Sequence, residues 1–508
     1  MADPKTEGQQ AEAVEVEEKS MLDSIFEKVA MTPPSESVDI GQFKDSEAGV
    51  AAPGGMMAAA LRVFVDAVSE LGQPVDRLDK NLLDSMLSEL DYKISGQLDE
   101  IMHHPHFQKM ESSWRGLKFL VDRTNFRKNT RIEVLNISKD ALRESFEDAP
   151  EMIQSALYRH VYSGAYDQAG GDPYSAMIGN YEFDAGAQDI SLLQDVSKVA
   201  SAAHCPFISA VGTNFFRKKS MEDWKKVPDL SAYMETTDYV KWNAFRETED
   251  ARYIGLTFPR FALRVPYGPD TEPVKAFNYQ ENVKGTDHDK YLWGNTAFSF
   301  AANMTRAFAQ DGWCVQIRGP QSGGKVEDLP VHLYDAGKGK EMKIPTEVAI
   351  DETLEFEASN LGFIPLVHYQ GKDYASFFSA NSCKKPDIYD DPAATANSRV
   401  NARLPYILLA SRLAHYLKVL QRENIGSTKD KTRIQNELNR WLKGLVTETP
   451  NPSESIIARY PLRAGEVTVD EIPENPGFYK VSMMFQPHFQ VEGMDISLQM
   501  VGKMPTGG

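Results

Sequence analysis

SAMIGNYEFDAGAQDISLLQDVSKVASAAHCPFISAV, residues 175–211, is the segment that gives the clearest indication of the fold class. Residues 175–183 have the pattern of a strand, residues 190–203 have the periodicity of a helix, and residues 206–211 again have the pattern of a strand. A strand, a helix and a strand in this order form a β-α-β unit, whose strands are parallel and joined by a right-handed crossover. We therefore predict a mixed fold, α/β with α+β parts, around a partly parallel sheet.

More elements are expected on both sides of this unit. Further strands are predicted at residues 253–258, 314–318 and 331–334. Before the unit, residues 56–125 have a helical pattern with two apolar stripes. The first stripe comprises Leu83, Leu87, Leu90, Ile94, Leu98 and Ile101, and the second comprises Trp114, Leu117, Leu120 and Val121.

The segment 404–446 predicts two helices of different character. Residues 404–420 are apolar on most sides, which indicates a helix that is largely buried. Residues 428–445 predict an amphipathic helix. Its apolar stripe comprises Ile434, Leu438, Trp441, Leu442 and Leu445, and its opposite face comprises Lys429, Arg433, Asn436, Arg440 and Lys443.

Both ends of the chain carry short apolar segments. An acidic tail, residues 1–20, precedes a helical pattern formed by Leu22, Ile25, Phe26 and Val29. This segment is either an arm that docks on another surface or a helix that folds back on its own domain. Three strand-like pieces close the chain, and a sheet of two or three strands is only marginally stable alone. Their apolar faces comprise Val467 and Val469, then Tyr479, Val481, Met483 and Phe485, and finally Met494, Ile496, Leu498 and Met500.

Composition limits the class of protein. A length of 508 residues indicates several domains, and 42% hydrophobic with 25% charged residues indicates a soluble globular chain. The formal charge of −18 argues against a general nucleic-acid binder. Charge is unevenly distributed, because residues 397–443 carry +7 and the remainder about −25. The three cysteines, Cys205, Cys314 and Cys383, are far apart, and neither a signal peptide nor an apolar membrane span is present, which indicates a reducing cytoplasm.

Two motifs suggest chemistry but are better explained otherwise. Residues 319–325, GPQSGGK, have the spacing of a phosphate-binding loop, yet Val326 stands where such a loop needs Ser or Thr, and Glu327 and Asp328 would repel phosphates. The HHPH segment, residues 103–106, has no second ligand cluster for zinc, and Pro105 more plausibly ends the preceding helix. We therefore expect no metal, no cofactor and no catalytic residues; the alternative is a cytosolic α/β nucleotide-binding enzyme that uses the Gly319–Lys325 loop.

A series of ordered motifs is similar to one known family. They are HHPHFQKMESSWRGL (103–117), DPY (172–174), GNYEF (179–183), HCPF (204–207), RYIGL (252–256), PR (259–260), LRVPYG (263–268), WGN (293–295) and the glycine loop 318–330. Together they resemble the large sheath subunit of type VI secretion systems, the TssC/VipB/EvpB/ImpC family. The similarity covers about residues 20–500.

The resemblance implies a structural protein with a contractile-tail-sheath-like fold and extended N- and C-terminal arms, not an enzyme. Its implied partners are a small sheath subunit (TssB/VipA type), an inner tube protein (Hcp type), neighbouring sheath heterodimers, a baseplate and a AAA+ recycling unfoldase (ClpV type) that acts mainly through the small subunit. Contraction of such a sheath propels the tube into a target cell. The implied location is the bacterial cytoplasm, in a sheath attached to a membrane-anchored baseplate. A sheath subunit of a phage-like contractile particle would share this architecture.

These observations assign expected roles to five regions. They are a flexible acidic arm (1–55), a helical segment (56–130), a central α/β region (131–385), a helical part facing the inner tube (386–465) and a strand arm (466–508). The expected tube contacts are Lys429, Arg433, Arg440 and Lys443, by analogy with contractile tails. The apolar residues of the N-terminal arm and of the three terminal strands are expected to link neighbouring subunits by strand exchange.

Overall fold

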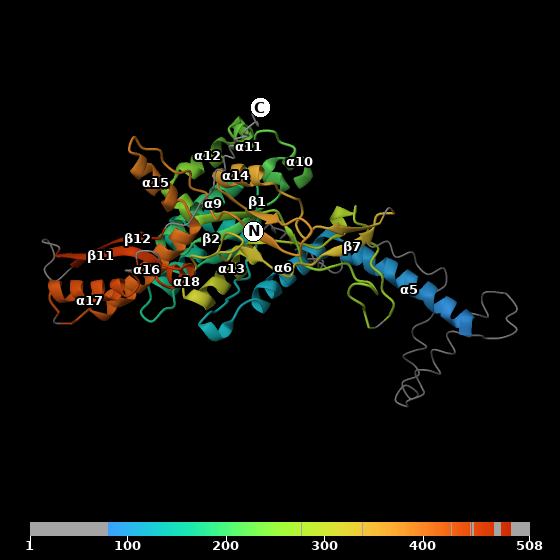
Figure 1. The fold of residues 1–508 in the computed structure, drawn as a ribbon, viewed down its shortest axis with the longest axis horizontal. Coiled ribbons are helices and arrows are strands. Elements are labelled where there is room, and N and C mark those ends of the chain that lie inside the picture. The colour runs from blue at the N-terminus through green and yellow to red at the C-terminus, as the bar shows by residue number, and fades with distance from the viewer. Residues whose placement is uncertain are drawn as a thin grey trace, which may run out of the picture. The chain divides into compact units, whose positions relative to one another are not determined.

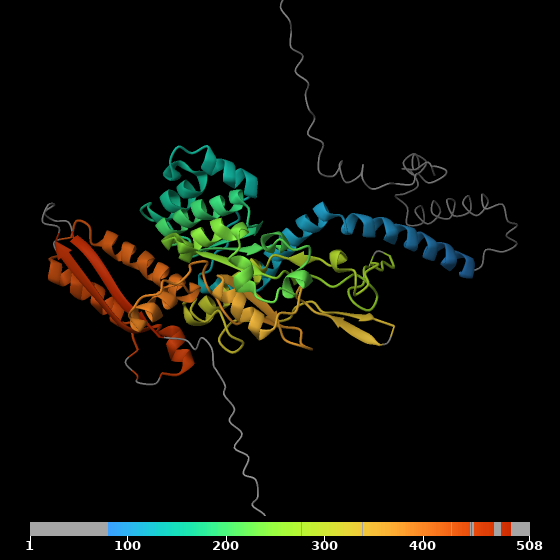
Figure 2. The same cartoon turned by 90° about the horizontal axis from the view of Figure 1, so that it is seen from above.

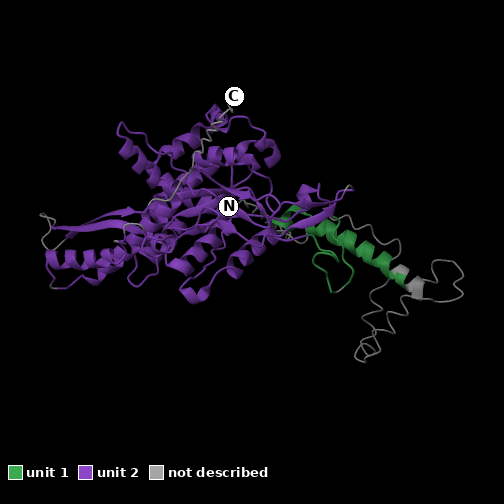
Figure 3. Ribbon diagram, viewed as in Figure 1, with its two compact units in different colours: residues 1–109, 266–283 green, residues 110–265, 284–508 purple. Residues whose placement is uncertain are grey.

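The computed structural model of the chain (Figure 1; Figure 2) describes residues 80–488, except 276, 338, 428, 448, 450, 451 and 472–478. The chain divides into two compact units (Figure 3): unit 1 comprises residues 1–109 and 266–283, and unit 2 comprises residues 110–265 and 284–508. Four predicted segments lie wholly or partly outside the described residues. They are the acidic tail (1–20), the N-terminal arm with Leu22, Ile25, Phe26 and Val29, the part of the predicted helical segment that precedes residue 80, and the third terminal strand with Met494, Ile496, Leu498 and Met500.

From residue 80 onward, the predicted N-terminal helical segment forms two helices. α5 (Lys80–Met102) belongs to unit 1, and α6 (Pro105–Asp122) begins at the proline that was expected to end the helix before it. Proline suits the first turn of a helix because its missing amide would have no partner there. The predicted stripe on α5 is only partly covered, since Leu87 and Leu90 are each about half exposed.

Unit 2 is built on a six-stranded sheet. β1 (Met177–Phe183) and β2 (Phe207–Val211) are parallel and joined by α9 (Ala187–Ala202), which confirms the predicted β-α-β unit. The strand order is β1-β2-β3-β9-β10-β6. β3 (Ile254–Phe258) and β9 (Phe363–His368) continue the parallel part, whereas β10 (Ala375–Phe377) and β6 (Lys325–Val326) are antiparallel.

Helices cover both faces of this sheet, so its strands are apolar on both sides. On one face, α9, α12 (Val240–Glu247) and α14 (Glu352–Asn360) enclose an aromatic cluster that includes Trp242 and Phe363. On the other face lie α13 (Thr296–Asp311) and the first half of α16 (Leu404–Glu423). α6 approaches α13 closely at Gly116, where an added Cβ would lie 2.5 Å from the Phe298 ring.

The prediction of a strand at residues 314–318 is wrong. Residues 314–318 form no ladder, although the alternation of apolar side chains is real. Val315 packs with the C-terminal elements and Ile317 packs below the central sheet. The two side chains therefore fill two separate cores, and this accounts for the period of two without strand pairing.

The C-terminal part of unit 2 forms its own core (Figure 2). The second half of α16 packs with α17 (Lys431–Lys443) and with a hairpin of β11 (Leu462–Glu471) and β12 (Tyr479–Pro487). α16 is the long, largely buried helix that the sequence predicts, and it contributes Leu404 and Ile407 to the sheet core and Leu409 and Leu413 to the C-terminal core. One helix thus connects the two cores.

The remaining elements are short. They are η1 (Phe126–Lys128), α7 (Lys139–Glu147), η2 (Met152–Gln154), α8 (Ala156–Tyr158), the π-helix η3 (Arg159–Tyr166), η4 (Thr213–Phe216), α10 (Met221–Lys225), α11 (Leu230–Met234), η5 (Thr237–Tyr239), η6 (Glu249–Tyr253), β4 (Phe261–Ala262), η7 (His288–Lys290), β5 (Trp293–Gly294), β7 (His332–Asp335), β8 (Lys340–Lys343), α15 (Pro392–Asn401) and α18 (Glu454–Arg459). β7 confirms the strand predicted at 331–334, but it pairs with β8 in a hairpin outside the central sheet.

Candidate assembly surfaces

α17 has the amphipathic character that the sequence predicts. The Asp430 carboxylate caps the helix by accepting a hydrogen bond from the Arg433 amide at 3.0 Å. Ile434, Leu438 and Leu442 of the apolar stripe are buried against the hairpin. The opposite face is left to solvent.

Three of the four predicted tube-contact residues lie on this solvent-facing side. Arg433, Arg440 and Lys443 are exposed on α17. Lys429, contrary to the prediction, precedes the helix, and its Nζ lies 2.5 Å from Glu437 Oε2 and 2.7 Å from Asn424 Oδ1. Its charge is therefore paired within the chain, and the basic face is defined here as Arg433, Arg440 and Lys443.

The two terminal strands that the structure describes form an antiparallel hairpin within the chain. Val467 pairs with Met483 and Val469 pairs with Val481. Val467 and Val469 are fully buried, and Tyr479, Val481, Met483 and Phe485 pack against the same core. Glu466, Thr468 and Asp470 are exposed, which confirms the predicted alternation of apolar and polar faces.

The glycine loop does not have the geometry of a phosphate site. The Gly319 amide donates to the Phe377 carbonyl at 2.7 Å, and the Gly324 amide donates to the Gly319 carbonyl at 2.8 Å. Lys325 lies in a strand, and its Nζ is 2.5 Å from Glu327 Oε1. A phosphate cradle needs free amides at a helix N-terminus, whereas these amides bind the chain's own backbone.

An ion pair between the half-buried Arg260 and the buried Glu347 stabilises the loop that follows β3. Arg260 donates two hydrogen bonds to Glu347, at 3.0 Å from Nε and 2.7 Å from Nη2, and His288 Nε2 lies 3.4 Å from the same carboxylate. Burial alone would raise the pKa of Glu347. The hydrogen bonds and charges of Arg260 and His288 outweigh that effect and hold the pKa at about 2.

Replacing Glu347 by glutamine is expected to flatten the acid dependence of stability. A carboxyl whose pKa falls from 4.5 to about 2 on folding stabilises the protein above the unfolded value and loses that contribution as pH falls toward 2. Between about pH 5 and pH 3, wild type should lose about 2 kcal/mol more than Glu347→Gln. Urea unfolding at both pH values measures this, with Glu341→Gln on the exposed side of β8 as the control. Equal acid losses in wild type and Glu347→Gln would contradict the prediction.

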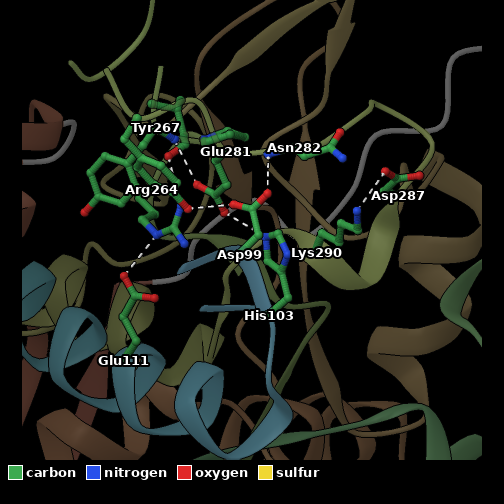
Figure 4. Close-up of polar contacts among 12 residues, drawn as sticks. Asp99, His103, Glu111, Arg264, Tyr267, Glu281, Asn282, Asp287 and Lys290 are labelled. Atoms are coloured by element: carbon green, nitrogen blue, oxygen red, sulfur yellow. Dashed lines mark hydrogen bonds and ion pairs between the residues drawn. The ribbon is translucent and has the colours of Figure 1, made fainter. Parts of the chain in front are cut away.

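The histidine segment 103–106 belongs to unit 1, and His103 forms a polar contact within that unit (Figure 4). His103 Nε2 lies 3.0 Å from Glu281 Oε1, and the other carboxylate oxygen accepts the Tyr267 amide at 2.9 Å. Asp99 of α5 accepts from the Tyr279 hydroxyl at 2.7 Å and from the Asn282 amide at 3.0 Å. These contacts fasten the segment 266–283 to the end of α5, which gives His103 a structural role.

The described part of the chain has neither a metal-binding cluster nor a membrane-spanning helix. Among residues 80–488 with their gaps, no group of three or more His, Cys, Asp or Glu side chains is arranged to hold a metal ion. Within the same residues, no helix combines the length and apolar character needed to cross a bilayer.

Comparison with known proteins identifies the family. The family described as EvpB/VC_A0108, tail sheath N-terminal domain, matches residues 84–384, and its tail sheath gpW/gp25-like domain matches residues 393–504. The chain belongs to the EvpB/VC_A0108 tail sheath family. Type VI secretion system sheath protein TssC1 of Pseudomonas aeruginosa is 42% identical over 428 residues, which are 84% of this chain and 86% of that protein.

Similar solved structures include chains of two prophage assemblies, with low sequence identity to this tail sheath chain. The anti-feeding prophage baseplate matches with a TM-score of 0.38 and 10% identity, over 73% of this chain and 83% of that chain. The contracted helical sheath of the anti-feeding prophage matches with a TM-score of 0.30 and 11% identity, over 61% and 66% of the two chains. The six-stranded sheet and the helices that cover it confirm the mixed α/β class predicted from the sequence.

Sequence reasoning missed the polar residues that fasten these elements together. Asn439 binds the backbone of Val467, and Glu347 binds Arg260. Asn439 follows buried Leu438 at the border of the apolar stripe. A polar side chain at that border is the feature of the sequence that could have indicated this contact. No local pattern in the sequence indicated the ion pair of Glu347, because its partners are far away in the sequence.

Proposed function

We propose that this chain is the large subunit of a type VI secretion contractile sheath. It pairs with a small sheath subunit, polymerises around an inner tube of Hcp type and contracts to drive the tube into a target cell. The 42% identity to a sheath protein over 84% of the chain is the observation that carries this proposal. The sheath lies in the bacterial cytoplasm on a baseplate, and a ClpV-type unfoldase recycles it through the small subunit.

The chain acts without enzymatic activity of its own in this proposal. The amides of the glycine loop bind the chain's own backbone and Lys325 pairs with Glu327, which supports a structural loop. The energy of contraction is then conformational and stored in a metastable lattice. Co-expression with the small sheath subunit and electron microscopy test the proposal: tubular sheaths are expected, and a chain that forms no complex with that subunit would refute it.

Neighbouring subunits are linked through their terminal segments in this proposal. The hairpin supports the idea, because a two-stranded sheet has edges to which a further strand can bind. The donated strands come from the arm around Leu22, Ile25, Phe26 and Val29 or from the segment Met494–Met500 of adjacent subunits. Backbone ladders between subunits would preserve connectivity while the lattice changes shape.

Deleting residues 1–32 is expected to prevent sheath growth. The truncated chain should still form soluble heterodimers, because the core clusters of unit 2 lie outside the deletion. Long sheaths should be absent in electron micrographs. A truncation of residues 1–15, which retains the apolar segment, is the control, and sheaths of normal length from the longer deletion would contradict the prediction.

The basic face of α17 is proposed to contact the inner tube. Exposed ion pairs contribute up to about 1 kcal/mol each, so they can be released on contraction while many subunits together hold the tube. Reversing Arg433 and Arg440 to glutamate is expected to abolish assembly around the tube and to leave heterodimers intact. Reversing exposed Lys241 and Lys340 makes the same change in net charge and serves as the control. Equal tube co-purification for both double variants would refute the assignment.

A further inference from the structure

A small cavity of about 30 Å³ lies where the end of α13, the middle of α16 and the segment before β1 meet. Its apolar walls are Phe308, Trp313 and Leu408, and its polar groups come from Ser175, Cys314 and Arg412. Leu408 belongs to the core below the sheet, and Trp313 belongs to the C-terminal core. The cavity therefore lies at the point where α16 passes from one core to the other.

Arg412 brings a positive charge into the cavity wall without a partner in the described part of the chain. Its Nε is buried and has no hydrogen-bond partner, and no carboxylate of the described residues forms an ion pair with its guanidinium group. The Tyr416 ring centroid lies 4.8 Å from the guanidinium carbon. A ring face attracts the charge, but it does not supply an acceptor for the Nε–H group, which points in the guanidinium plane.

The other cationic side chains of α16 are paired. Lys418 Nζ lies 2.8 Å from Asp167 Oδ1. Arg422 donates to the Gln168 carbonyl at 2.9 Å and to the Asp167 carbonyl at 3.2 Å. Arg412 is thus the cation of this helix whose charge the described chain does not balance.

No carboxylate of the described chain is placed to balance that charge. The residues that line the cavity include neither Asp nor Glu. Asp311 follows the last turn of α13 toward the cavity, but burial raises its pKa and the cation that lowers it is Arg459. A buried donor on a charged group costs free energy when it has no acceptor, and an anion from outside would remove that cost.

We infer that this cavity binds one small monovalent anion of about the size of chloride, with Arg412 Nε as its charged donor. A space of about 30 Å³ holds one or two atoms of the size of a water oxygen, so sulfate and organic acids are too large for it. Ser175 is exposed, so the cavity opens on its side and its hydroxyl is a second donor. The apolar walls strengthen the attraction, because they lower the local dielectric constant.

This site would neutralise Arg412 where α16 connects the two cores. The inference concerns the single chain and does not depend on the proposed role in a sheath.

Chloride NMR tests the site, because bound chloride relaxes faster than free chloride and broadens the signal. Potassium chloride is titrated into the full-length chain, and potassium gluconate keeps the ionic strength constant. Saturable broadening is expected for wild type. Arg412→Gln should weaken chloride binding about tenfold or more, because a charge-assisted hydrogen bond is lost.

Arg127→Gln is the matched control. It removes the same charge from an exposed position outside the cavity and should bind chloride as wild type does. Circular dichroism establishes that both variants fold. Absence of saturable broadening in wild type, or equal broadening in wild type and a folded Arg412→Gln, would overturn the inference.

Competition on the wild-type chain decides the matter if Arg412→Gln does not fold. Bromide is expected to displace chloride and reverse the broadening, whereas sulfate at the same ionic strength should leave it unchanged. Cations on an open surface would instead favour the divalent ion. Displacement by sulfate as effective as displacement by bromide would therefore overturn the inference.

Discussion

Replacing Phe363 by alanine is expected to lower the free energy of unfolding by about 3–5 kcal/mol. Phe363 lies on β9 and is fully buried. Its ring stacks on Trp242 with centroids 5.5 Å apart, and Phe215 and Phe216 each lie at 5.3 Å. Alanine would leave a cavity among large rings that pack against both the sheet and α12, so they have little freedom to fill it.

Phe356 provides a matched control for this substitution. It lies on α14, close to β9 in the sequence, but it is 61% exposed. Phe356→Ala should change stability by no more than about 0.5 kcal/mol, as is usual for surface positions. Urea unfolding followed by tryptophan fluorescence measures both variants. Similar unfolding midpoints would show that the aromatic cluster is not the stabilising core described here.

Replacing Gly323 by alanine is expected to cost more than about 3 kcal/mol, because two effects combine. Gly323 has φ of +90°, a conformation that disfavours a side chain. An added Cβ would also lie 2.1 Å from the Gln316 carbonyl oxygen, and that oxygen belongs to backbone that cannot rotate away. The loop that resembles a phosphate site in sequence would then be unable to close on itself.

Gly337 separates the two effects. It has φ of +80° in the turn between β7 and β8, but no atom lies within 4 Å of its added Cβ. Gly337→Ala should therefore cost only the conformational term, about 1 kcal/mol. Thermal or urea unfolding compares the two variants. If both lose the same stability, the close contact at Gly323 is not important. Lys325→Ala should leave the fold intact, since the Lys325 side chain contacts Glu327 and Tyr374 at the surface and its backbone pairing with β10 does not depend on that side chain.

These stability effects bear on assembly through α16. The N-terminal half of this helix packs below the sheet, and its C-terminal half packs with α17 and the hairpin. A substitution that shifts α16 in the sheet core would therefore also affect the elements packed on its other half. These are α17, which presents the basic face, and the hairpin, where a strand is proposed to add. Assembly assays on core variants should therefore be accompanied by measurements of folding.

Much of the fold follows from patterns that are local in the sequence. The strands and the helix of the β-α-β unit in 175–211, the buried helix α16, the amphipathic helix α17 and the alternation along β11 and β12 were predicted from their own side-chain patterns. Each of these elements spans no more than about twenty positions, because strand and helix periodicities are short. The missing magnesium ligand at Val326 likewise argued against a nucleotide site from sequence alone.

Other features depend on residues that are far apart in the chain, and no local pattern specifies those contacts. Val315 and Ile317 alternate like a strand but fill two cores formed by different elements. The Asn439 side chain binds the backbone of Val467, 28 positions away, and Glu347 binds Arg260 across 87 positions. A hydrogen bond of this kind requires the folded chain to bring the donor and the acceptor together. The basic face and the hairpin could therefore be predicted from periodicity, whereas the hydrogen bonds between Asn439 and the Val467 backbone were decided by tertiary packing.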